Sequence, residues 1–199
     1  MSELKLFNKW DTSEIRVEDP GLIKYINLKP IIVPRTGGRN VKTQFWKSKN
    51  HVVERLINKL MIPGHKGKKH KISSGVCSGK ANTAYHIVEE TFKIIEKKTG
   101  KNPVEVFVKA LEHASPREEI TTIEYGGARY PKAVECAPQR RVDLALRLMT
   151  QGAYANSFGK KKLVQDALAD EILKAYKIDQ TSNAIGKKLE LERQADASR

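Results

Sequence analysis

The residues with the clearest chemical potential in this sequence are lysines and arginines concentrated in one segment. Residues 35–80 contain 12 Lys and Arg against a single acid, Glu54, which is a net charge of +11 out of +14 for the 199-residue chain. Guanidinium and ammonium groups gathered in this way bind phosphate and displace its condensed counterions. The segment therefore predicts a polyanionic partner, and nucleic acid is the leading one.

The candidate phosphate ligands fall into three groups along the chain. The first lies in a basic arm of residues 35–49, and the second in and just after a basic, glycine-rich loop of residues 63–79 that we expect to order on its ligand. The third lies where helices are predicted to begin, and cations there favour phosphate contact because the helix dipole opposes them unless an anion compensates. A solvated charged face is the alternative for any isolated run. The candidates are Arg35, Arg39, Lys42, Lys47, Lys49, Lys66, Lys68, Lys69, Lys71, Lys80, Arg140, Arg141, Lys160, Lys161 and Lys162.

Aromatic side chains are interleaved with these charges. Phe45 and Trp46 lie in the basic arm, and Tyr125 and Tyr130 lie near a predicted hairpin turn. Aromatic rings of this kind stack on unpaired bases in many RNA-binding proteins. For Phe45 and Trp46, burial against the helices is an equally good interpretation.

Nucleotide and metal motifs are weak in this sequence. The run from Gly75 to Lys80 resembles a phosphate-binding P-loop, but its glycine spacing is one residue short, and Ala81 replaces the expected Ser or Thr. Zinc ligands would have to come from His65, His70, Cys77 and Cys136, whose spacings match no common zinc site. We therefore expect no metal and no cofactor.

No set of residues suggests catalysis. Cys136 lacks a glycine-framed nucleophile motif and an oriented partner. The acid pairs Glu89 with Glu90 and Asp170 with Glu171 lie on predicted helices, where acids usually solvate a surface or form i, i+4 pairs. The sequence predicts a protein that is not an enzyme.

The compartment follows from the apolar pattern and the cysteines. No run approaches the roughly 20 apolar residues needed to span a bilayer, and the first residues lack a secretory signal. We expect a cytoplasmic protein without a membrane partner, in which Cys77 and Cys136 stay reduced.

Apolar periodicity predicts the elements that position these groups. Residues 1–17 are weakly patterned and indicate a peripheral extension. Helices are predicted at residues 50–61, with Arg55 and Lys59 on the exposed face, at residues 80–99, and from Pro103 to just before Pro116. Three more helices follow Pro138. The predicted fold is a single, mostly α domain: a bundle of about six helices with an extended two-stranded β-hairpin arm.

Residues 119–136 are predicted to form that hairpin. Gly126 and Gly127 suit a two-residue turn that needs positive φ at both positions. Pairing outward from the turn places Glu124 opposite Arg129 and Ile123 opposite Tyr130, an opposite-charge pair and an aliphatic-aromatic pair that both support this register. A two-stranded ribbon is unstable alone, so it must lean on the helices or on a partner.

The order of these motifs resembles that of the small-subunit ribosomal protein seven family, in its archaeal form. The resemblance covers nearly the whole chain and rests on PRTGGR, VERLINKLM, KALE, IEYGGARYPKAVE, PQRRVDLALRLMTQGA and SNAIGKKLELER. The basic insertion after VERLINKLM is similar to the one in archaeal and eukaryotic members of the family. The hairpin followed by PQRR is the most specific part.

The resemblance implies a function and a set of partners. It implies a structural constituent of the small ribosomal subunit that binds the three-prime major domain of the ribosomal RNA and nucleates assembly of the head. Its place would be the subunit interface near the decoding centre, beside other small-subunit ribosomal proteins. The hairpin tip would face the exit-site tRNA and the mRNA path through Tyr125, Gly126, Gly127, Arg129 and Tyr130.

Two other classes share parts of this pattern. A free-standing RNA-binding or RNA-chaperone protein outside the ribosome would carry the same charge, but it would not need the hairpin between helices. An RNA-modifying enzyme would need a cofactor or a pocket for a flipped base, and no motif indicates either.

Overall fold

The computed structural model describes residues 4–64 and 79–199, and within them it contains six α-helices and one two-stranded antiparallel hairpin. The predicted fold class is confirmed. Most of the basic loop, with Lys66, Lys68, Lys69 and Lys71, lies outside the described residues. The elements are the 3₁₀ turns η1 (Arg39–Lys42) and η2 (Trp46–Lys49), α1 (Val52–Leu60), α2 (Ala81–Thr99), α3 (Pro103–Ala114), β1 (Glu118–Tyr125), β2 (Ala128–Glu135), α4 (Pro138–Ser157), α5 (Val164–Tyr176) and α6 (Asn183–Ala197).

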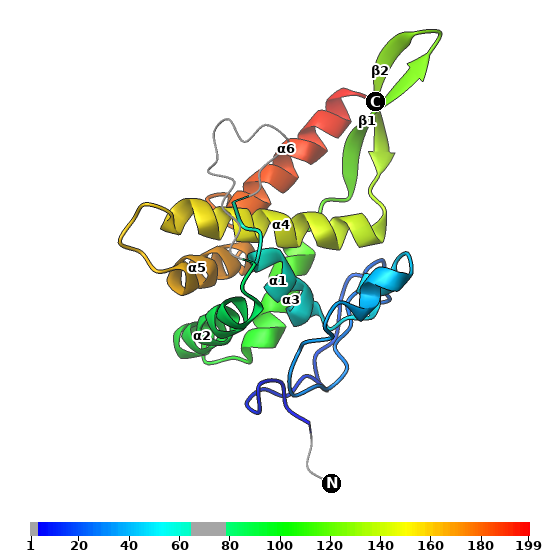
Figure 1. Ribbon diagram of the computed structural model, residues 1–199. Helices are drawn as coiled ribbons and strands as arrows, with labels where there is room; N and C mark the ends of the chain where they lie inside the picture. Colours follow the sequence, from blue (N-terminus) through cyan, green and yellow to red (C-terminus); the bar gives the residue numbers. More distant parts are fainter. Residues whose placement is uncertain (1–3, 65–78) are drawn as a thin grey trace.

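Helix α5 packs more extensively against the other helices than any other helix of the bundle does. It packs against α2, α3, α4 and α6, and its buried face combines Ala167, Leu168 and Ile172. Small alanine side chains let neighbouring helices approach closely, while the branched residues fill the space between them. In Figure 1, α4 crosses the molecule above α1, α2 and α3, and α6 runs beside it toward the hairpin.

The ends of the predicted helices are confirmed where the sequence carries capping signals. Asn102 accepts a hydrogen bond from the Val104 amide at 3.0 Å, and Pro103 occupies the first turn of α3. Gly100 ends α2 in the left-handed conformation, with φ of 66°.

The N-terminal segment is not peripheral, contrary to the sequence interpretation. Leu6, Phe7 and Trp10 are buried in the core. The Trp10 ring meets Phe92 edge-on at 5.7 Å, and its Nε1 donates to Glu96 Oε2 at 3.2 Å. Three apolar residues in an irregular segment have no helical or strand period, which is why periodicity did not predict their burial.

The hairpin has the predicted register. Tyr125 pairs with Ala128 and Glu124 with Arg129, around a turn in which Gly126 and Gly127 have φ of 58° and 81°. Its distal part projects from the body (Figure 1), whereas its base packs on α6. There Arg199 Nη2 donates to Glu118 Oε1 at 2.5 Å.

Glu171 differs from the prediction of a surface acid. Its side chain is buried, and Oε1 accepts hydrogen bonds from Ser182 Oγ at 2.8 Å and from the Ala184 amide at 3.0 Å. Burial raises the pKa of this carboxyl, and those two hydrogen bonds oppose the shift. The carboxylate thereby satisfies the first turn of α6 and joins it to α5.

Gly152 of α4 lies close to Glu171 of α5 and to Asn183 at the start of α6. A Cβ there would lie 2.9 Å from both Glu171 Cδ and Asn183 Cβ. We expect Gly152→Ala to lower stability by about 1–2 kcal/mol through overpacking, although alanine normally favours a helix. Thermal unfolding measures the change.

The control for this prediction is the reverse exchange at an exposed position of the same helix. Ala155→Gly should cost only about 0.5–1 kcal/mol, the ordinary helix-propensity difference. A Gly152→Ala protein with a raised melting temperature would show that α4, α5 and α6 are not in close contact there.

Candidate nucleic-acid interface

The basic arm is held by contacts with the helices behind it. Glu54, the one acid in the basic segment, is buried on α1 and accepts from the Thr36 amide at 2.9 Å and from Thr36 Oγ1 at 2.6 Å. Arg35 Nη1 donates to Asn82 Oδ1 of α2 at 2.9 Å. The acid thus positions the arm, which contains the two 3₁₀ turns η1 and η2.

The aromatic residues of the arm face solvent. Phe45 is 60% exposed and Trp46 is 38% exposed, so the alternative of burial against the helices is wrong. Lys49 Nζ lies 4.6 Å from the centre of the Trp46 ring, a cation–π contact that orients both side chains. Exposed rings beside cations suit stacking on bases.

Asp143 of α4 is the acid that joins the arm to the bundle. Its Oδ1 accepts from Arg55 Nη2 at 3.0 Å, and its Oδ2 pairs with Lys47 Nζ. Burial acts to raise the pKa of Asp143, but the Lys47 hydrogen bond and the Arg55 charge outweigh it and hold the pKa below its ordinary value.

Arg55 is buried, with only 5% exposure, and is not on an exposed face of α1 as predicted. Its Nη1 also donates to the Tyr25 carbonyl at 2.9 Å. The helical period placed Arg55 outside because it cannot reveal a partner 88 residues further along the chain. Buried guanidinium groups need such partners.

A hollow of about 370 Å³ lies beside Asp143, between the arm, α1 and the start of α4. We call it the basic groove. It is lined by Phe45, Lys47, Lys59, Ala137, Gln139, Arg140, Asp143, Leu144 and Arg147.

Like charges crowd this groove. Burial lowers the pKa of Lys59; Asp143 opposes this, and the charges of Lys47, Arg147 and Arg55 lower it further. One carboxylate therefore faces several cations, and the excess positive charge suits an anion. Lys59 and Arg147 were missed as candidates; the spacing of Arg140, Asp143 and Arg147 on one helix face was the available signal.

Arg140 and Arg141, predicted phosphate ligands, already have partners inside the protein. Arg141 is buried, and its Nη2 donates to Asp19 Oδ2 at 2.6 Å. Arg140 forms a two-pronged pair with Glu119 of β1, at 2.5 and 2.6 Å, yet stays half exposed on the groove. We therefore keep Arg140 in the candidate interface and leave Arg141 out.

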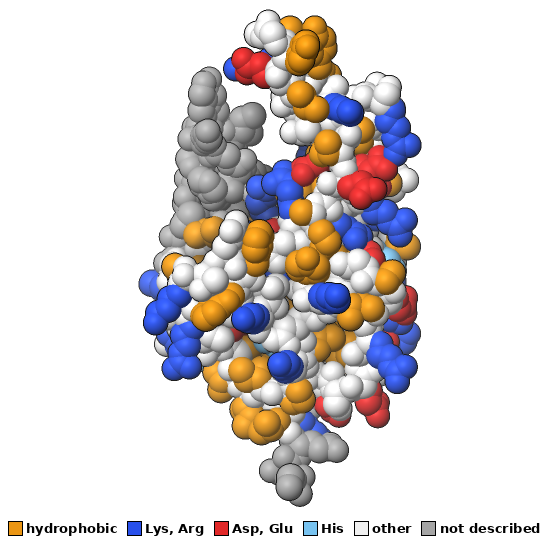
Figure 2. Space-filling model, turned by 90° about the vertical axis from the view of Figure 1, so that its right-hand side faces the viewer, with side chains coloured by type: hydrophobic (Ala, Val, Ile, Leu, Met, Phe, Trp, Pro, Cys, Tyr) orange, Lys and Arg blue, Asp and Glu red, His pale blue; other side chains and the backbone are white. Residues whose placement is uncertain are grey.

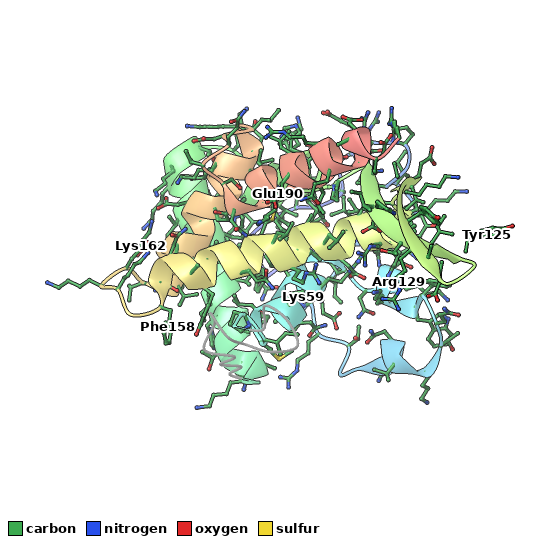
Figure 3. The ribbon with its side chains drawn as sticks, turned by 90° about the horizontal axis from the view of Figure 1, so that it is seen from above. Lys59, Tyr125, Arg129, Phe158, Lys162 and Glu190 are labelled. Atoms are coloured by element: carbon green, nitrogen blue, oxygen red, sulfur yellow. The ribbon has the colours of Figure 1, made fainter. Side chains whose placement is uncertain are left out.

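The remaining candidates are dispersed. Lys160, Lys161 and Lys162 precede α5, which begins at Val164, so they lie in the α4–α5 connection rather than in a first helical turn. Figure 3 shows Lys162 at the opposite end of α4 from the hairpin. Lys80 is exposed at the N-cap of α2.

The hairpin tip is free of the body. Tyr125 is 83% exposed, and the exposed Arg129 has its Nε 3.6 Å from Glu124 Oε2 across the strands. Figure 3 shows Tyr125 pointing away from the helices. The tip thus presents an aromatic and a cationic group to whatever lies beyond it.

Residues 23–199 match the family model described as ribosomal protein S7p/S5e. The chain belongs to this family. The small ribosomal subunit protein uS7 of Nanoarchaeum equitans is 55% identical over 99% of this chain and 100% of its own length. The proteins of the same name from Methanothrix thermoacetophila and Methanothermobacter thermautotrophicus are 48% and 50% identical, over 98% and 94% of this chain and 100% and 95% of their own lengths.

Family membership settles the broad class. The chain is a structural protein of the small ribosomal subunit in the cytoplasm, and not an enzyme. Burial raises the pKa of Cys136, the described cysteine, to about 11, which leaves its thiol protonated at neutral pH. No helix in residues 4–64 or 79–199 is long and apolar enough to cross a membrane, and no described His, Cys, Asp or Glu cluster could hold a metal ion.

The ion pairs of Asp143 lead to a prediction about the stability of this fold. Asp143→Asn leaves Arg55 buried with its charge uncompensated, and we expect a loss of about 3 kcal/mol at pH 7. Because the folded-state pKa of Asp143 is lowered, the wild-type advantage exists above about pH 4 and disappears as pH falls through the folded value. Urea unfolding at several pH values measures both effects.

The matched control is Asp196→Asn, an exposed acid on α6. It should change stability by less than about 0.5 kcal/mol at every pH. If Asp143→Asn behaved in the same way, the carboxylate would not be holding the arm to the bundle.

Proposed function

We propose that this protein is a primary binder of the three-prime major domain of small-subunit ribosomal RNA and that it nucleates assembly of the subunit head. The observation that carries the proposal is the segregation of charge: the arm and the basic groove gather cations around two acids, Glu54 and Asp143, that already have partners. The surplus charge is available for phosphate.

Internal pairing divides the cations into two kinds. Arg55 and Arg141 are buried and form ion pairs inside the protein. Arg39, Lys42 and Lys49 are exposed and form no ion pair within the described parts of the chain. The exposed group, with Arg35, Lys59 and Arg147 beside it, forms the proposed RNA surface. Figure 2 shows Lys and Arg side chains spread over the face that carries the arm, while the acids on this face lie mainly near the hairpin and at the edges of the view.

We include the basic loop in the proposed RNA surface because of its lysine content. The four lysines Lys66, Lys68, Lys69 and Lys71 lie between Gly64 and Gly79, the described residues on either side of the loop. The Gly79 amide donates a hydrogen bond to the Met61 carbonyl at the end of α1. The attachment points therefore adjoin α1, beside the arm. We include these lysines, and Lys80, in the RNA surface.

The hairpin serves a different purpose in this proposal. Its base is fixed to α6 and to Arg140, while its tip extends away from the cationic surface. We propose that the tip reaches toward the exit-site tRNA and the mRNA path at the subunit interface, and that other faces of the bundle contact neighbouring ribosomal proteins. Lys160, Lys161 and Lys162, at the far end of α4, form a separate cationic site for either RNA or such a neighbour.

The first test removes three exposed cations of the arm. Replacing Arg39, Lys42 and Lys49 by Ala should weaken binding to the ribosomal RNA domain. It should also flatten the dependence of log affinity on log salt by roughly 0.7–0.9 for each phosphate that the variant no longer neutralises. Filter binding at several salt concentrations measures both.

A charge-matched control comes from another part of the surface. Lys97, Lys174 and Lys177 lie near the C-terminal ends of α2 and α5 and also form no ion pair among the described residues. Their triple Ala variant should keep nearly the wild-type affinity and salt slope. Equal reductions in affinity for the two variants would mean that net charge alone, and not the arm, drives binding.

The second test shortens the hairpin. A protein in which a short glycine link replaces residues 122–131 should still fold and bind ribosomal RNA, because the tip lies outside the core. Subunits that contain it should instead show altered exit-site tRNA retention or reading-frame maintenance. Loss of RNA binding with an unchanged helical circular dichroism spectrum would make the hairpin a primary RNA anchor and contradict this division.

A further inference from the structure

Gln139, in the first turn of α4, carries a buried amide that the fold does not use. The side chain is 7% exposed, and neither Oε1 nor Nε2 has a hydrogen-bond partner among the described residues. Buried amides are nearly always paired, since an unpaired donor or acceptor costs stability. An apolar side chain of the same size would suit this position better if the protein acted alone.

The surroundings of Gln139 indicate what the amide is for. It lines the basic groove together with Phe45, Lys47 and Arg147. Phe45 opens η2 with a φ of 65°, a left-handed conformation that is strained for an aromatic residue and that tends to persist at functional positions. An unpaired amide, an exposed ring and several cations therefore share one hollow.

We propose that the basic groove holds a single unpaired nucleotide of the RNA, with its base edge on the Gln139 amide. The ring of that base stacks on Phe45, and its phosphates pair with the cations of the rim. Because both amide atoms are buried, the base reaches them when the exposed side chain of Arg147 turns aside. This inference rests on the proposed RNA-binding function and names one nucleotide-binding site within it.

The amide distinguishes a base from other anionic ligands. Phosphate accepts hydrogen bonds only, so it would leave Oε1 of Gln139 unpaired. A base edge offers an acceptor next to a donor, which matches both halves of the amide. Adenine is the base we expect, because both its Watson–Crick edge and its N6/N7 edge have this pattern.

The experiment is a double-mutant cycle between the protein and the RNA. Each unpaired adenosine of the ribosomal RNA domain is replaced in turn by purine riboside, which keeps the ring but lacks the N6 donor, and affinity is measured for the full-length wild-type protein and for Gln139→Leu. In the wild type, one replacement should weaken binding about 5- to 150-fold, the usual range for a bidentate base contact. The same replacement should change the affinity of Gln139→Leu very little.

Stability measurements separate this role from a structural one. Gln139→Leu should melt at the same temperature as the wild type or higher, because it removes unpaired buried groups. Gln139→Met is a second apolar variant in case leucine does not fit. Phe45→Ala should also lose the response to that adenosine, whereas Phe158→Ala, which removes an exposed ring at the far end of α4, and Gln165→Leu on α5 should keep it.

The outcomes separate the inference from the function beneath it. A wild-type protein that does not bind the RNA domain overturns the proposed function, and this site with it. Salt-dependent binding in which no single adenosine matters, or in which it matters equally to Gln139→Leu, overturns the nucleotide site alone.

Discussion

The pairing of Asp143 with Arg55 and Lys47 is the interaction on which the proposed RNA surface depends. Those three side chains come from α4, α1 and η2, so one carboxylate fixes the basic arm against two helices. Without it, the arm would keep its contacts through Arg35 and Thr36 but would lose the ion pair that joins it to α4. Positive charge close together is self-repelling. A partly buried acid, Asp143, together with Glu54 behind the arm, offsets that repulsion and leaves the outer cations free.

This arrangement explains why so few acids lie in the basic segment and why they are where they are. Glu54 faces inward, and its Oε1 accepts two hydrogen bonds from Thr36, so it orders the arm without competing for phosphate. Asp143 reaches the same region from α4. The protein therefore neutralises the cations needed for folding and leaves the others unpaired, which suits a partner that supplies phosphates of its own.

The sequence predicted most of the fold because the signals involved were local. Asn102, Pro103 and Gly100 mark helix ends through capping chemistry, and Gly126 with Gly127 set the hairpin register through turn geometry. Local signals of this kind cannot predict ion pairs between residues that are far apart in the sequence. Arg55 and Arg141 read as exposed or phosphate-facing because Asp143 and Asp19 lie far away in sequence, and the burial of Leu6, Phe7 and Trp10 has no period to reveal it. The sequence could not predict the basic groove, because the groove forms only where the fold places the arm beside α4.

The central claim is that the arm and groove face the three-prime major domain of small-subunit ribosomal RNA. The most direct measurement is directed cleavage of that RNA by a hydroxyl-radical source attached to a cysteine at position 42, compared with one at position 97, in protein that lacks its native cysteines. The account predicts strong cuts within the three-prime major domain from position 42 and weak or no cuts from position 97. Cuts of equal strength from both positions, or cuts from position 42 that fall outside this domain, would contradict it.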